Sequence, residues 1–87
     1  MSGLSECQIA LSREVEHWSK MPCEQLVSEL RDIREYQVEV GANRYQVEVQ
    51  LLENTERYVH VSVAVDDFSF RRSLVPLSTS FVKQKDQ

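Results

Sequence analysis

The sequence predicts an α+β domain, in which two N-terminal helices pack on one face of a three- to four-stranded antiparallel β-meander to give two layers. Two observations lead to this fold class. Up to residue 31, apolar residues recur every three or four positions, as in amphipathic helices. From residue 36 to 65, apolar and polar residues alternate instead, as in strands with one buried face.

The first helix is expected from Leu4 to Ser19. Ser2 and Ser5 are its two candidate caps, and Glu6 lies in the first turn, where the helix dipole favours negative charge. Pro22 is well placed to open a second helix that runs to about Arg31. The residues expected to face the core are Leu4, Cys7, Leu11, Val15 and Trp18 in the first helix and Cys23, Leu26, Val27, Leu30 and Ile33 in the second.

A β-hairpin is predicted by a repeated pentapeptide. The sequence YQVEV of residues 36–40 recurs at 45–49, and Gly41-Ala42-Asn43-Arg44 separates the copies. With these four residues as the loop, Val40 faces Tyr45, and all six apolar side chains share one face. This register also keeps carboxylates from lying directly opposite each other.

The third strand is expected at Tyr58–Val65, with its valines on the buried face. After a tight reversal at Asp66-Asp67, we expect a fourth strand from Phe68 to Leu74. For residues 77–82 a short helix, an edge strand and an ordered coil all remain open. Residues 83–87 are expected to be frayed.

Composition favours one small domain spanning residues 1–87, because 41% of the 87 residues are hydrophobic and only two are glycine and two proline. We find no targeting segment and no apolar run long enough for a membrane span, so we expect a soluble, cytoplasmic protein. Cys7 and Cys23 are too few for a disulfide framework, although a single bridge between the helices is left open.

Catalysis and metal binding are not expected. The candidate zinc ligands are Cys7, Cys23, His17 and His60, but no two lie close enough in sequence to come from one turn. His17 is ten residues from Cys7 along the first helix, about 15 Å, which is too far for a hydrogen bond. We therefore expect no metal, no cofactor and no enzyme activity.

The C-terminal part of the chain favours association with another protein. It carries more apolar side chains than one short strand can hide beneath two helices. We expect a non-catalytic protein-interaction or accessory module, with a homodimer as one form. The predicted interface consists of Phe68, Phe70, Arg71, Arg72 and Phe81, with Phe70 and Phe81 as anchors and the arginines at the rim.

The alternative is a ligand- or nucleic-acid-binding module that uses the basic segment around Arg71 and Arg72. Charge weighs against nucleic acid, because residues 1–67 carry a balance of −7 and residues 68–87 a balance of +3, within a net charge of −4. Aromatic and basic residues also fail to interleave on consecutive strands, as they do in single-strand binders. A protein partner is the favoured interpretation.

Overall fold

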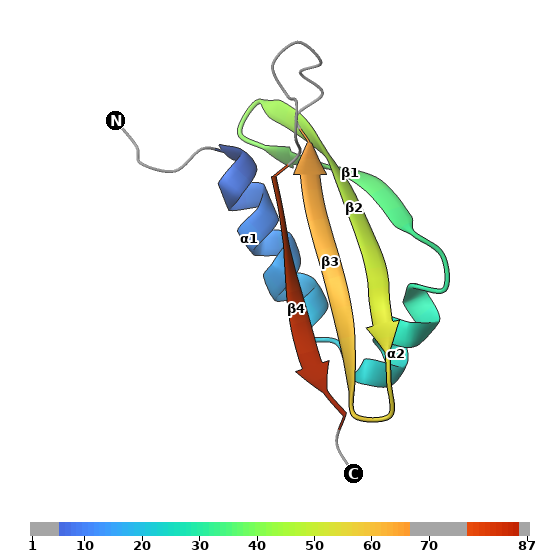
Figure 1. Ribbon diagram of the computed structural model, residues 1–87. Helices are drawn as coiled ribbons and strands as arrows, with labels where there is room; N and C mark the ends of the chain where they lie inside the picture. Colours follow the sequence, from blue (N-terminus) through green and yellow to red (C-terminus); the bar gives the residue numbers. More distant parts are fainter. Residues whose placement is uncertain (1–5, 67–76, 86–87) are drawn as a thin grey trace.

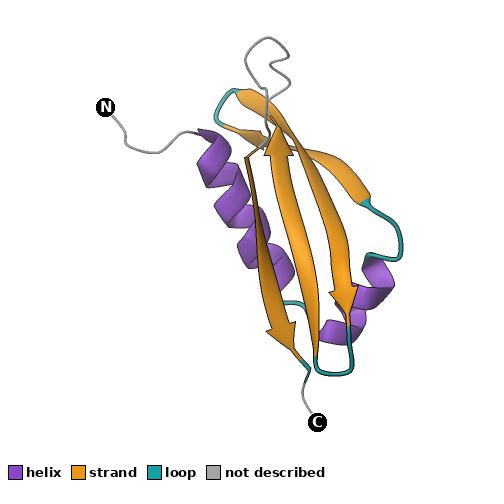
Figure 2. Ribbon diagram, in the orientation of Figure 1, coloured by secondary structure: helices purple, strands orange, loops and turns teal. Residues whose placement is uncertain are grey.

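The computed structural model describes residues 6–66 and 77–85. In these residues the four strands form one antiparallel sheet in the order β1-β2-β3-β4, accompanied by two helices (Figures 1 and 2). This confirms the predicted α+β class and the meander. The elements are α1 (Glu6–Ser19), α2 (Cys23–Glu29), β1 (Arg34–Val40), β2 (Asn43–Asn54), β3 (Tyr58–Asp66) and β4 (Leu77–Gln84).

Within the described residues, both helices form where the apolar spacing predicts them, while Leu4, the expected start of the first helix, lies outside these residues. In α1, Ala10 and Trp18 are buried. Pro22 lies just before α2 with φ −63° and ψ 155°, so it occupies the N-cap position and is not the first residue of the helix. The helix ends at Glu29, earlier than predicted, and Ile33 is 47% exposed, so Ile33 does not belong to the apolar stripe.

The hairpin between β1 and β2 is tighter than predicted. Val40 pairs with Asn43, so only Gly41 and Ala42 form the loop, and Val38 instead of Val40 faces Tyr45. Gly41 has a φ of +62°, which allows this short connection because glycine tolerates the left-handed region. The four-residue loop was therefore wrong, but a register shift of two positions keeps every side chain on its predicted face.

The observed register changes the charge pairing across the hairpin. Glu35 lies opposite Glu48, contrary to the expectation that carboxylates are kept apart, and Glu39 lies opposite Arg44. The Glu39 and Arg44 side chains form an ion pair at 3.9 Å and are largely exposed. Glu35 is exposed and Glu48 is half-buried, so water screens the repulsion between the opposed glutamates in part.

The core lies along the valine face of β2 and β3. Val59, Val61, Val63 and Val65 are all 0% exposed, which confirms the alternation predicted for the third strand. One irregularity occurs in β2, where the register shifts between Leu51 and Glu53 at a β-bulge. The buried core residues are Ala10, Trp18, Leu26, Leu30, Val40, Tyr45, Val47, Val49, Val59, Val61, Val63 and Val65.

The strand next to β3 is β4, whose register runs from Val65 opposite Leu77 to Tyr58 opposite Gln84. Of the three alternatives left open for residues 77–82, the edge strand is therefore correct. The predicted strand Phe68–Leu74 and the reversal at Asp67 lie outside the described residues. Fraying from residue 83 was wrong for residues 83–85, because β4 includes residues 83 and 84 and the backbone N–H of Lys85 donates to the carbonyl of Arg57 at 2.8 Å.

Candidate protein interface

The outer edge of β4 exposes backbone hydrogen-bonding groups. The bond from the N–H of Lys85 to the carbonyl of Arg57 fixes the phase of the ladder, because alternate residues of an antiparallel strand point to opposite sides. With the observed register, Ser78, Ser80 and Val82 direct their N–H and C=O groups away from β3. Within the described part of the chain, no strand lies beyond β4.

The opposite edge of the sheet belongs to β1 and has a different character. The same phase, carried through β3 and β2, makes Glu35, Gln37 and Glu39 the residues whose backbone groups point outward. Two of these three edge residues therefore carry carboxylates, and Arg34 at the start of the strand pairs with Glu29 at 2.7 Å. Charged side chains on an edge strand oppose pairing with another chain.

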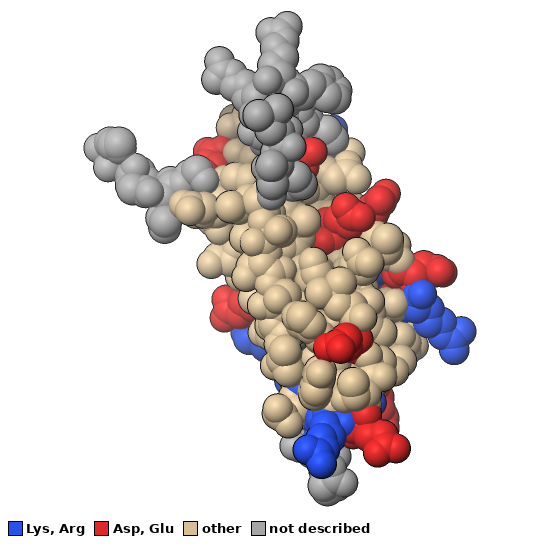
Figure 3. All heavy atoms as spheres, viewed as in Figure 1, with Lys and Arg blue, Asp and Glu red and all other residues tan. Residues whose placement is uncertain are grey.

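No charge interrupts the β4 edge from Leu77 to Val82, a run of six residues. Ser78, Ser80 and Val82 are exposed, and Val82 retains 52% of its accessible surface. In Figure 3 the surface along β4 is largely uncharged, while several acidic side chains of this face lie toward β1 and β2. Of the two outer strands, β4 is therefore the one suited to pair with another strand.

A polar cluster lies beside this edge, on the face of the sheet that carries the Ser80 side chain. Ser80 Oγ is 3.0 Å from His60 Nε2, and His60 Nδ1 is 3.7 Å from Glu53 Oε1. The Tyr58 hydroxyl donates to the same Glu53 oxygen at 3.1 Å, and this bond raises the pKa of Tyr58.

These are residue types of a nucleophile, a base and an orienting carboxylate. However, a separation of 3.7 Å between His60 and Glu53 exceeds hydrogen-bond distance, so the carboxylate does not orient the imidazole as a triad requires. The Glu53 side chain is also 53% exposed. We interpret the cluster as polar contacts between neighbouring strands.

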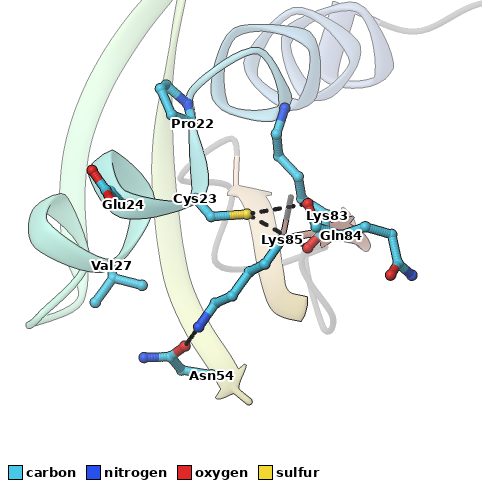
Figure 4. A pocket seen from close by; sticks show the side chains of 8 residues that line it. All are labelled: Pro22, Cys23, Glu24, Val27, Asn54, Lys83, Gln84 and Lys85. Atoms are coloured by element: carbon cyan, nitrogen blue, oxygen red, sulfur yellow. Dashed lines mark hydrogen bonds between the residues drawn. The ribbon is translucent and has the colours of Figure 1, made fainter. Parts of the chain in front are cut away.

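The C-terminal end of β4 is held by contacts with both helical segments, around a cavity of about 580 Å³ (Figure 4). The Cys23 thiol approaches the Gln84 carbonyl at 3.5 Å, and the Lys83 ammonium donates to the Ser19 carbonyl at 2.9 Å. Lys85 donates to the Asn54 side chain at 2.7 Å. Because these groups already bond within the chain, we interpret the contacts around the cavity as structural: they hold the C-terminal end of β4 in place.

The two cysteines lie at opposite ends of the β3–β4 pair. The Cys7 thiol donates to the Val65 carbonyl at 3.8 Å, next to Leu77, whereas Cys23 lies beside Gln84. Seven residue steps separate Leu77 from Gln84, about 23 Å along a strand. A disulfide needs Cα atoms within about 7 Å, so the bridge that the sequence left open does not form, and neither cysteine is part of a disulfide.

Polar contacts join α1 to β1. The indole N–H of Trp18 donates to the Tyr36 hydroxyl at 2.8 Å, and this hydroxyl donates to the carboxylate of Glu14. Burial, followed by the bond to Glu14, raises the pKa of Tyr36. Sequence reasoning missed this network, although a buried tryptophan normally requires a partner for its N–H.

Of the interface residues predicted from sequence, the structure describes Phe81. It lies opposite Val61 and is half-buried against the core. The other four, Phe68, Phe70, Arg71 and Arg72, lie outside the described residues, so that part of the interface stays a prediction. Sequence reasoning missed the exposed residues of β4, and the uncharged run from Leu77 to Val82 was the signal that could have revealed them.

Comparisons of the chain with protein-family models, with curated proteins and with solved structures found no match. Neither described helix has the length and apolar character needed to cross a membrane. Within residues 6–66 and 77–85, no three His, Cys, Asp or Glu side chains gather as a group that could hold a metal ion.

Proposed function

We propose that this chain is a non-catalytic protein-interaction module, and that its partner adds a strand to the outer edge of β4. The observation that carries the proposal is the contrast between the two outer strands: β1 is charged, whereas β4 is exposed and uncharged from Leu77 to Val82. In strand addition, the backbone provides affinity and the alternating side chains provide specificity.

The proposal includes a two-layer arrangement, in which both helices cover the valine face of the sheet. Support comes from the buried side chains, because Ala10 and Trp18 of α1 and Leu26 of α2 belong to the same cluster as the valines. In Figure 2 both helices are drawn behind the sheet. The opposite face, which includes Ser80, is then accessible to the partner that pairs with β4.

The predicted interface residues fit this site by their position in the chain. Residues 68–72 precede β4 closely in sequence, and Phe81 is part of it. A partner strand along β4 would lie beside the backbone of Ser78, Ser80 and Val82 and cover the exposed part of Phe81. Phe81 then contributes apolar contact on the core side of the strand, while the backbone hydrogen bonds set the orientation of the partner strand.

A pair of proline variants tests this function. Ser80→Pro removes a backbone N–H that points outward from β4, and Gln37→Pro removes the equivalent group from β1. Neither change removes a bond of the internal ladder, so both variants should fold, which amide NMR spectra can verify. We expect proteins captured by the immobilised wild-type chain to be lost with Ser80→Pro and retained with Gln37→Pro. Capture that is equally strong with Ser80→Pro would contradict the β4 edge as the site.

The alternative, a ligand- or nucleic-acid-binding module around Arg71 and Arg72, stays a prediction because both arginines lie outside the described residues. Among described residues, Lys83 and Lys85 already donate to acceptors within the chain. Titration of the chain with a single-stranded oligonucleotide, followed by NMR, would support this alternative if the shifts centred on Arg71 and Arg72.

A further inference from the structure

We infer that the partner strand is β4 of a second copy of this chain, joined in antiparallel fashion across a two-fold axis at Ser80. This inference rests on the proposed function, because it uses the same edge. The two sheets then continue into one another, and each copy supplies the same residues to the contact.

The ladder phase makes this pairing possible. Ser78, Ser80 and Val82 all point their backbone groups outward, so an axis at Ser80 sets Ser80 opposite Ser80 of the second copy and Ser78 opposite Val82 of the second copy. Each of these is a hydrogen-bonded pair position. The outward groups of both strands therefore find partners without any change in the fold.

Charge favours this pairing over the equivalent one at β1. An axis at Gln37, the middle of β1, would set each Glu35 opposite Glu39 of the second copy, so that carboxylate faces carboxylate. At β4 the same operation sets Lys83 opposite Leu77 of the second copy, and no like charges face each other. Charge repulsion thus disfavours self-pairing at β1, whereas no such repulsion opposes it at β4.

The core side of β4 adds apolar contact. With the axis at Ser80, Phe81 faces Thr79 of the second copy, and the symmetry repeats this contact on the other side. Thr79 is exposed and Phe81 only half-buried in the single chain, so both can lose solvent-accessible surface on pairing. An aromatic residue opposite a β-branched residue is a favourable cross-strand pair.

A charge-swap experiment tests the axis directly. Because Ser80 would face its own copy, Ser80→Lys sets two ammonium groups opposite each other, and Ser80→Glu sets two carboxylates opposite each other. We expect each variant alone to associate at least about tenfold more weakly than the wild type. A one-to-one mixture of the two variants should recover dimers, because lysine then faces glutamate. Sedimentation over a concentration series measures the mass relative to the 10.1 kDa chain.

The matched controls are Gln37→Lys and Gln37→Glu, which alter an outward residue of β1 and should leave association unchanged. A wild type that stays monomeric at high concentration would overturn the dimer inference, as would variants at Ser80 that dimerise as strongly as the wild type. The proposed function is tested separately. If the chain is monomeric while Ser80→Pro still abolishes capture of another protein, the dimer inference fails and the function stands.

Discussion

At the scale of single residues, a few polar side chains join α1 to β1. Tyr36 accepts a bond from the Trp18 indole at 2.8 Å and donates to Glu14, so one hydroxyl joins β1 to two positions of the helix. Trp18 is only 3% exposed, and water cannot easily replace the hydroxyl as its partner. A buried donor without an acceptor costs more than the bond itself contributes.

We therefore expect Tyr36→Phe to lower the free energy of unfolding by about 1–3 kcal/mol, because it leaves the indole N–H of Trp18 without its acceptor. Urea unfolding measures the change. The matched control is Tyr58→Phe, whose hydroxyl bonds the exposed side chain of Glu53 and should cost less than about 0.5 kcal/mol. Equal losses in the two variants would show that the Trp18 contact contributes nothing specific.

At the scale of elements, the start of α1 is tied to the β1–β2 hairpin. The Glu6 carboxylate accepts bonds from the Asn43 side chain at 2.7 Å and from the Tyr45 hydroxyl at 2.8 Å. A Cβ added at Gly41 would lie 2.8 Å from the same carboxylate, which shows how closely the helix approaches the turn. The glycine is thus required for its positive φ, whereas the Glu6 carboxylate, at the end of a flexible side chain, could move to make room for a Cβ.

This tie should depend on pH. The bonds from Asn43 and then from Tyr45 lower the pKa of Glu6 below its ordinary value of 4.5. Because the folded-state pKa is the lower one, the contribution is present above pH 4.5 and is lost as the pH falls through the folded-state value.

We expect Glu6→Gln to destabilise the chain near neutral pH, and the difference from the wild type to shrink in acid. Urea unfolding at several pH values measures this, with Glu56→Gln, an exposed glutamate in the β2–β3 turn, as the control. A difference that stays constant across the acid range would contradict the role of the Glu6 carboxylate.

Much of the element order could be predicted from sequence, because side-chain periodicity reports directly on burial. The alternating valines of β3 are the clearest example, since all four are fully buried. The hairpin register was harder, because shifting it by two residues leaves every side chain on the same face, and periodicity cannot distinguish the two registers. The short Gly41-Ala42 loop decides between them, and this depends on backbone geometry at the turn.

The fourth strand was predicted less well than β3. Leu77–Gln84 has exposed residues on both faces, so it lacks the alternation that identified β3. Its pairing with β3 and its contacts with Ser19 and Cys23 come from distant parts of the chain, which a local pattern does not report. Phe81 as an interface anchor stays a prediction, and its position opposite Val61 required the sheet register.

At the scale of the whole molecule, the sheet has two unlike outer strands. Glutamates occupy two of the three outward positions of β1, whereas serines and a valine occupy positions 78, 80 and 82 of β4. The proposed function and the dimer both depend on the phase of the β3–β4 ladder, because a shift of one residue would turn the outward groups of Ser78 and Ser80 inward. The central claim is therefore that these residues point away from β3.

Amide hydrogen exchange in β4, followed by NMR in dilute solution, tests this claim most directly. The account predicts slow exchange at Thr79, Phe81 and Lys83, whose N–H groups face β3, and fast exchange at Ser78, Ser80 and Val82. The opposite alternation, with Ser78, Ser80 and Val82 protected and Thr79, Phe81 and Lys83 exchanging fast, would contradict it.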